Sequence, residues 1–268
     1  MPFRTIEISD PTLTPPGFQF ITVQSPALRQ RVDVTVYVPT SAKPQQALPT
    51  VTLLHGVYGS HWAWAFKGGA HVILEKLIAA GRIQPMALLM PSDGLWGDGS
   101  AYMKHGDRDY AAWIVEEVAE AAAQADARLA GGPRFIAGLS MGGFGALRLG
   151  ALYPEKFAAF SGLSSATDLS QLEELCRQSG FHYDLALGQP SSVADAMLTN
   201  RERLRPFRFD CGSKDFLIEP NRRLHRELIA AGIEHRYVEN PGEHNWPYWQ
   251  KHLGDTLEFF SDQLTDSI

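Results

Sequence analysis

Short, almost continuously apolar runs alternate along this chain with longer segments whose apolar residues lie on one side. The short runs predict buried strands at residues 50–55, 85–90, 134–137, 157–161, 207–211 and 235–239. The longer segments predict helices at residues 70–80, 110–129, 141–153, 220–231 and 246–262. Strands that are apolar on both faces and alternate with helices are typical of a mostly parallel sheet with helices on both faces. The pattern therefore predicts an α/β fold.

Two segments depart from this alternation. Residues 18–23 and 31–38 predict an antiparallel opening pair, because their apolar positions repeat with a period of two. Residues from about 163 to 206 form an irregular insert, in which Ser170 and Glu173 have the spacing of a helix capping box. No linker divides the chain, so we expect a single domain, residues 1–268, with the insert as a small cap over a site at the carboxyl ends of the strands.

A serine lies between a predicted strand and a predicted helix, in the sequence Gly138-Leu139-Ser140-Met141-Gly142. So sharp a turn forces the serine into strained backbone torsions, and only very small residues two positions away on either side avoid a clash. The turn exposes the hydroxyl close to the first N–H groups of the helix. Acyl transfer needs both, because the hydroxyl attacks a carbonyl and an N–H group receives the oxyanion. Ser140 is therefore the candidate nucleophile.

A serine nucleophile needs a histidine base and a carboxylate that orients it, both at the same edge of the sheet. His244 follows the last predicted strand and precedes the final helix, and the other eight histidines fit this place less well. Asp215, in the loop after the strand at 207–211, is the expected acid; Asp210, which belongs to the strand itself, is the alternative. The resulting order Ser, Asp, His along the chain is that of α/β-hydrolases and differs from the order in chymotrypsin or subtilisin.

The oxyanion needs two backbone donors. Met141, the residue after the nucleophile, is expected to supply one N–H group. The second should come from the loop Gly56-Val57-Tyr58-Gly59, where the glycines let the backbone approach a reacting carbonyl closely. Val57 is the expected donor and Tyr58 the alternative.

Charge and composition exclude several function classes. The net charge is −6 with both signs dispersed, so no basic stripe predicts binding to nucleic acid or to anionic lipid. The chain has neither metal-ligand spacing nor a phosphate-binding or dinucleotide-binding glycine pattern, so we expect no metal and no cofactor. The two cysteines are too few for a disulfide framework, and no signal peptide or membrane-spanning run is evident, which predicts a cytoplasmic location. The expected partner is a small-molecule ester, and a homo-oligomer is compatible with the sequence.

Several motifs, in order along the chain, resemble the esterase D-like branch of the α/β-hydrolases. They are Leu53-Leu54-His55-Gly56, His61-Trp62-Ala63-Trp64, Met90-Pro91, Gly138 to Gly143, Cys211-Gly212 with Asp215-Phe216-Leu217, and Gly242-Glu243-His244 with Trp246 and Trp249. This branch includes tributyrin, acetyl and feruloyl esterases, S-formylglutathione hydrolases and mycolyltransferases. The resemblance implies an α/β-hydrolase fold with the triad and oxyanion donors named above. It also implies a serine carboxylesterase that hydrolyses small, short-chain or aromatic esters through an acyl-enzyme.

Two alternatives use the same acyl-enzyme, namely an acyltransferase and an S-formylglutathione hydrolase-like thioesterase. The thioesterase is disfavoured because S-formylglutathione hydrolases carry a cysteine in the loop after the oxyanion strand, whereas residues 57–62 of this chain contain none. The roles of Trp62, Trp64 and Trp96 stay open between packing and lining a pocket, and Asp93 has no assigned role.

Overall fold

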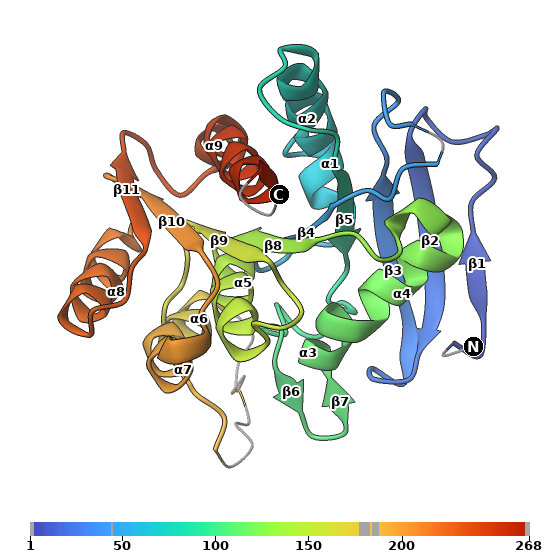
Figure 1. The fold of residues 1–268 in the computed structure, drawn as a ribbon. Coiled ribbons are helices and arrows are strands. Elements are labelled where there is room, and N and C mark those ends of the chain that lie inside the picture. Colours follow the sequence, from blue (N-terminus) through green and yellow to red (C-terminus); the bar gives the residue numbers. More distant parts are fainter. Residues whose placement is uncertain (1–2, 44, 177–182, 184–187, 266–268) are drawn as a thin grey trace.

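The computed structural model describes residues 3–43, 45–176, 183 and 188–265, and it contains a large sheet between two layers of helices (Figure 1). The strands are β1 Ile6–Ile8, β2 Phe18–Ser25, β3 Gln30–Tyr37, β4 Thr50–Leu54, β5 Ala87–Pro91, β6 Lys104–His105, β7 Arg108–Asp109, β8 Arg134–Leu139, β9 Ala159–Leu163, β10 Phe207–Gly212 and β11 Arg236–Asn240. The helices are α1 Ala63–Phe66, α2 Ala70–Ala79, α3 Tyr110–Ala112, α4 Val118–Ala125, α5 Met141–Leu152, α6 Leu169–Leu175, α7 Val193–Thr199, α8 Ile218–Ala230 and α9 Trp246–Thr265.

The main sheet has the strand order β1-β2-β3-β5-β4-β8-β9-β10-β11 among the described residues. The pairs from β1 to β5 are antiparallel, and every pair from β5 to β11 is parallel. β4, β5 and β9 are buried along their whole length, as strands covered on both faces must be. The mostly parallel sheet is therefore confirmed, and the carboxyl ends of β4, β8, β10 and β11 meet at one edge.

Each face of the sheet has its own hydrophobic core. One core joins the sheet to α3, α4, α5, α6, α7 and α8, with Phe144 and Leu224 among its buried side chains. The other joins the opposite face to α1, α2 and α9, with Trp64 and Leu253 among its members. Figure 1 shows the same division, since α1, α2 and α9 lie on one side of the strands and α4, α5 and α7 on the other.

The segment predicted as one helix at 110–129 is interrupted. A π-helical turn, Trp113–Glu117, separates α3 from α4, and the helix ends at Ala125. Asp126 ends it because this residue is extended (φ −146°, ψ 114°) and its carboxylate accepts a hydrogen bond from the N–H of Arg128. A polar side chain that satisfies the backbone locally competes with the helix in this way.

The insert between β9 and β10 contains α6 and α7. The capping box predicted at Ser170 is wrong, because Asp168 is the N-cap of α6 and accepts a hydrogen bond from the Ser170 N–H at 2.9 Å. α7 packs against α5 and α8 and so extends the helical layer of that face. Residues 177–182 and 184–187 of the insert lie outside the described residues, so the cap stays a prediction. Among the described helices, none combines the length and the apolar character needed to cross a membrane.

Candidate active site

Ser140 occupies a strained turn between β8 and α5. Its φ of 55° and ψ of −117° lie in a region that residues other than glycine rarely adopt. A Cβ atom on Gly138 would lie 2.2 Å from the carbonyl oxygen of Gly142, and one on Gly142 would lie 2.2 Å from the carbonyl oxygen of Leu54. Because both obstacles are backbone atoms, neither position has room for a side chain. The structure thus contains the tight turn that the glycine spacing predicts.

The side chains of Ser140, His244 and Asp215 form a continuous hydrogen-bonded row. The Ser140 Oγ lies 3.0 Å from His244 Nε2, and His244 Nδ1 lies 3.0 and 2.9 Å from the two carboxylate oxygens of Asp215. A carboxylate only accepts hydrogen bonds, so Nδ1 carries the proton and Nε2 is free to accept the serine hydroxyl. The Asp215 carboxylate is fully buried and also accepts the N–H of Leu217 at 2.8 Å, which fixes its orientation.

Each member of this row comes from the carboxyl edge of the sheet. Ser140 follows β8, Asp215 lies in the turn after β10, and His244 lies between β11 and α9. The loops of the last two approach each other closely, since a Cβ atom on Gly212 would lie 2.6 Å from the Gly242 carbonyl oxygen. Phe216 and Trp249 pack against the imidazole, with ring centroids 4.4 and 5.0 Å away. The histidine is thus held by packing as well as by hydrogen bonds.

The alternative acid, Asp210, is engaged elsewhere. Its buried carboxylate pairs with Arg208 at 2.9 Å and accepts the hydroxyl of Tyr248 at 2.8 Å. Burial raises the pKa of Asp210, and the neighbouring Arg208 opposes that rise. The Asp210 carboxylate is a structural group of the core, and Asp215 is the acid within reach of His244. Burial also raises the pKa of the Cys211 thiol, which keeps this buried residue protonated and unreactive.

Val57 and Met141 have their backbone donors close to the serine. In the described part of the chain, neither N–H group makes a hydrogen bond, whereas the N–H of Tyr58, the alternative donor, is bound to the Asp98 carbonyl at 2.9 Å. A Cβ atom on Gly56 would lie 3.3 Å from the Cβ of Ser140, so the loop after β4 runs directly beside the nucleophile. This geometry favours the two expected donors.

A cavity of about 330 Å³ opens at Ser140. Its lining is mostly apolar and aromatic, and it comes from the loops after β4 and β10, the end of β8, α1, the end of α6 and the start of α9: Val57, Tyr58, Trp62, Ala63, Leu139, Leu175, Phe216, Trp246 and Trp249. Tyr58, Trp62 and Phe216 are exposed and stand at its mouth. Lys67 also lines the cavity, and its Nζ lies 5.7 Å from the ring centroid of Trp246. The cavity therefore suits an uncharged apolar group next to the serine hydroxyl.

The structure shows where the three tryptophans and the aspartate without an assigned role lie. Trp62 lines the cavity, whereas the buried Trp64 donates its indole N–H to the carbonyl oxygen of Leu54 at 2.9 Å and packs in the core. Trp96 stacks on His105 with ring centroids 4.4 Å apart. Asp93 is buried beside His55 at the end of β4. His55 entered the sequence analysis only as part of the motif Leu53-Leu54-His55-Gly56, and no role for its side chain was expected, although it immediately precedes the oxyanion loop.

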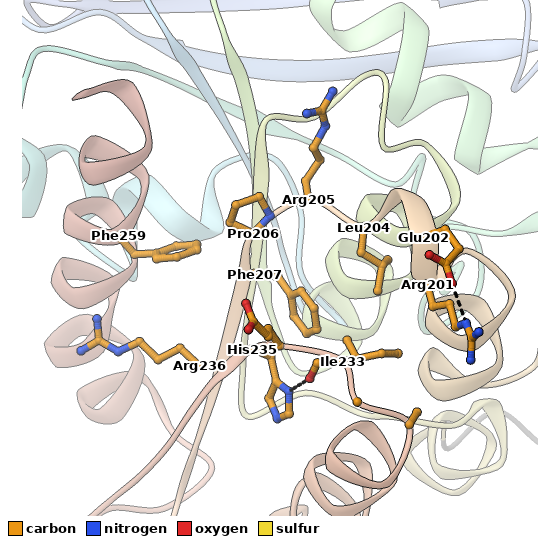
Figure 2. Close-up of a pocket in the computed structure, with 13 residues that line it drawn as sticks. Arg201, Glu202, Leu204, Arg205, Pro206, Phe207, Ile233, His235, Arg236 and Phe259 are labelled. Carbon is orange, nitrogen blue, oxygen red and sulfur yellow. Dashed lines mark hydrogen bonds and ion pairs between the residues drawn. The ribbon is translucent and has the colours of Figure 1, made fainter. Parts of the chain in front are cut away.

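A larger groove of about 900 Å³ lies where β10 and β11 begin, at the amino ends of the strands (Figure 2). Of the described residues that line it, none is a serine, threonine or cysteine. Figure 2 shows the guanidinium groups of Arg201, Arg205 and Arg236 pointing in different directions rather than toward one point. The described lining thus offers no hydroxyl or thiol nucleophile, and its three arginines do not converge. Within the described ranges, no group of three or more His, Cys, Asp or Glu side chains could hold a metal ion.

Comparison with solved structures shows which fold this arrangement belongs to. A ferulic acid esterase superposes with a TM-score of 0.77 at 22% identity, over 97% of this chain and 99% of that one. An S-formylglutathione hydrolase from Agrobacterium tumefaciens superposes with a TM-score of 0.74 at 19% identity, over 98% and 100% of the two chains. A fluorophosphonate-binding serine hydrolase from Staphylococcus aureus reaches 0.73 at 22% identity, over 91% and 98%. The chain therefore has the α/β-hydrolase fold of these proteins.

Sequence comparison identifies the family as well as the fold. A curated acetyl esterase from Caldicellulosiruptor saccharolyticus is 27% identical, and the alignment covers 80% of this chain and 84% of that protein. The family model described as "Putative esterase" matches residues 25–260, which include every residue of the Ser140 site. The chain belongs to this esterase family.

Proposed function

We propose that this esterase is a serine carboxylesterase that hydrolyses short-chain or aromatic carboxylic esters through an acyl-enzyme on Ser140. The observation that carries the proposal is the continuous row from the Ser140 hydroxyl through His244 to Asp215, with successive contacts of 3.0 and 2.9 Å, at the floor of an apolar cavity. A hydroxyl is a weak nucleophile by itself, and a neutral imidazole within hydrogen-bond distance activates it.

In the first half of the reaction, the Ser140 oxygen attacks the ester carbonyl carbon while its proton passes to His244 Nε2. The carbonyl electron pair moves to oxygen, and the N–H groups of Val57 and Met141 receive the resulting oxyanion. The tetrahedral intermediate then expels the alcohol, which takes the proton from His244. Asp215 holds the imidazole in the required tautomer and stabilises it while it carries two protons.

In the second half, water attacks the acyl group on Ser140 and gives a proton to His244. Collapse of the second tetrahedral intermediate returns this proton to Ser140 and releases the acid. An acyltransferase would differ only in admitting an alcohol in place of water, and a thioesterase only in the leaving group.

The cap at 163–206, the location of the protein and its oligomeric state stay predictions from the sequence.

The cavity supports the substrate class. Its volume of about 330 Å³ lies near the lower end of the range for small-molecule sites. Aromatic side chains at its mouth offer stacking surfaces for an aromatic ring as well as contact area for a short alkyl chain. Long acyl chains would extend beyond this lining into solvent.

The test combines labelling with a substrate panel. A fluorophosphonate should attach to the peptide that carries Ser140 and to no other, and Ser140→Ala should abolish both labelling and hydrolysis. Acetyl, butyryl, octanoyl and feruloyl esters, and a thioester, are then compared by kcat/KM with and without an added alcohol. Label on Ser164 or Ser165, which are also buried near the turn, or a preference for octanoyl esters, would contradict the proposal.

A further inference from the structure

His55 is a buried residue immediately after β4, and its ring makes two polar contacts. Nδ1 lies 2.7 Å from the carbonyl oxygen of Gly56, and Nε2 lies 3.3 Å from the backbone nitrogen of Asp93. The ring edge also faces Tyr102, with centroids 5.8 Å apart, and the Tyr102 hydroxyl donates to the His55 carbonyl at 2.9 Å. His55 thus has a single orientation, set from several sides.

These contacts determine which ring nitrogen of neutral His55 carries the proton. The Asp93 N–H can only donate, so His55 Nε2 must accept and the proton of the neutral ring must lie on Nδ1. Nδ1–H then donates to the carbonyl of Gly56. The Asp93 carboxylate is occupied by the N–H groups of Leu95 and Ser100, at 3.2 and 2.9 Å, and its nearer oxygen stands 3.6 Å from His55 Nε2. The backbone N–H of Asp93 therefore sets the tautomer.

The carbonyl that His55 binds belongs to the same peptide group as the N–H of Val57. In a trans peptide the C=O and N–H point in opposite directions, so a donor on the oxygen fixes where the N–H points. A hydrogen bond to the oxygen also polarises the group and makes its N–H a stronger donor. The Gly59 N–H donates to the same oxygen at 3.2 Å, so two donors hold this one carbonyl.

We propose that His55 is a positioning residue that orients and polarises the Gly56–Val57 peptide toward the oxyanion formed at Ser140. The inference rests on the proposed function, because it assigns His55 a task only if an oxyanion forms there. The space around the ring agrees with this assignment. A Cβ atom on Gly59 would lie 2.6 Å from His55 Nδ1, so the loop admits the ring only because residue 59 has no side chain.

Asparagine and leucine both branch at Cγ, as histidine does, so substituting each at position 55 distinguishes the hydrogen bond that His55 donates from the packing of its side chain. His55→Asn places an amide N–H where Nδ1 stood, and His55→Leu places a methyl group there. We expect His55→Leu to lower kcat by about tenfold, the effect of one net hydrogen bond, with KM nearly unchanged. His55→Asn should recover most of the loss at a similar melting temperature. Gly59→Ala, which displaces the ring from the Gly56 carbonyl, should resemble His55→Leu.

A spectroscopic measurement reports on the oxyanion itself. A trifluoromethyl ketone with a ¹³C-labelled carbonyl forms a hemiketal: the Ser140 oxygen bonds to the carbonyl carbon, the serine proton passes to His244, and the carbonyl electron pair becomes an oxyanion. The ¹³C shift followed against pH gives the pKa of the hemiketal hydroxyl. We expect this pKa to rise by about one unit in His55→Leu and Gly59→Ala, matching the tenfold loss, and to stay near the wild-type value in His55→Asn.

The outcomes distinguish the inference from the proposed function. If the wild-type enzyme forms no hemiketal on Ser140 and hydrolyses no ester, the proposed function fails. If the wild type behaves as expected but His55→Leu and His55→Asn have the same kcat and hemiketal pKa, His55 has only a packing role and the inference fails. Should His55→Leu not fold, the comparison of Gly59→Ala with His55→Asn decides in the same way.

Discussion

Replacing Asp215 by asparagine should disable this enzyme because it favours the His244 tautomer whose proton lies on Nε2. One carboxylate oxygen accepts the Leu217 N–H at 2.8 Å and lies 3.0 Å from His244 Nδ1, and the other lies 2.9 Å from Nδ1. In Asp215→Asn, the Leu217 N–H needs an acceptor and selects the amide oxygen, which leaves the amide NH₂ facing Nδ1. The shorter of the two contacts then places an amide N–H against Nδ1. This favours the His244 tautomer that carries its proton on Nε2, which can no longer take the proton of Ser140.

The expected loss is about 10⁴-fold in kcat, or about 5 kcal/mol of transition-state stabilisation. The assay is hydrolysis of a nitrophenyl butyrate, with the melting temperature as the measure of folding. Asp210→Asn is the matched control: it removes the partner of buried Arg208, so it should lower the melting temperature and leave kcat of the folded enzyme within about threefold. The reasoning would be refuted if Asp215→Asn kept a tenth of the activity, or if Asp210→Asn caused the larger loss in kcat.

The remaining predictions concern the nucleophile, the turn and acid stability. Ser140→Ala should lower kcat by about 10⁴-fold or more without changing the melting temperature by more than a few degrees, and a large drop in that temperature would point to a structural role. Gly142→Ala puts a Cβ atom 2.2 Å from the Leu54 carbonyl oxygen and should cost about 1–3 kcal/mol or more, measured by urea unfolding. The matched Gly254→Ala in α9 meets nothing closer than 3.9 Å and should gain about 0.5–1 kcal/mol. Burial lowers the pKa of His61 below its ordinary 6.5, so the unfolded chain binds a proton that the folded one resists, and stability falls as the pH drops through and below that value. His61→Gln should flatten the melting temperature between pH 7 and 5, and an unchanged slope would contradict this account.

Much of the parallel half of the fold was predictable because its signals are local. Continuous apolar runs mark β4, β5, β8 and β9, and glycines after α2 and α8 mark helix ends. The strands that escaped prediction are β1, β6 and β7, which have two or three residues each and are mostly not fully buried. Such strands form by pairing with a neighbour rather than from an apolar pattern of their own.

The candidate site was predictable in outline because the glycines around Ser140 indicate the strained turn and the positions of the predicted strands indicate the order of the triad residues. Loop position favoured Asp215 over Asp210 and Val57 over Tyr58, but the contacts that occupy the two alternatives are made with residues distant in sequence. Arg208 and Tyr248 occupy Asp210, and the Asp98 carbonyl occupies the N–H of Tyr58. Hydrogen-bond partners across loops are properties of the folded chain. For the same reason, the motif that contains His55 does not show what its ring contacts, because one of those contacts is the backbone N–H of Asp93.

The division of the hydrophobic core into two parts, one on each face of the sheet, affects when activity appears during refolding and when it is lost during unfolding. Ser140 immediately precedes α5, which packs on one face of the sheet, whereas His244 lies two residues before α9, which packs on the other. The two side chains are 3.0 Å apart, and we expect this contact to form only when both helical layers are docked. Ester hydrolysis during refolding therefore reports completion of both layers, and we expect it to lag behind the burial of Trp113, which belongs to the α5 side alone. On gentle denaturation, loosening of α9 would switch off the enzyme while the nucleophile and its turn stay folded.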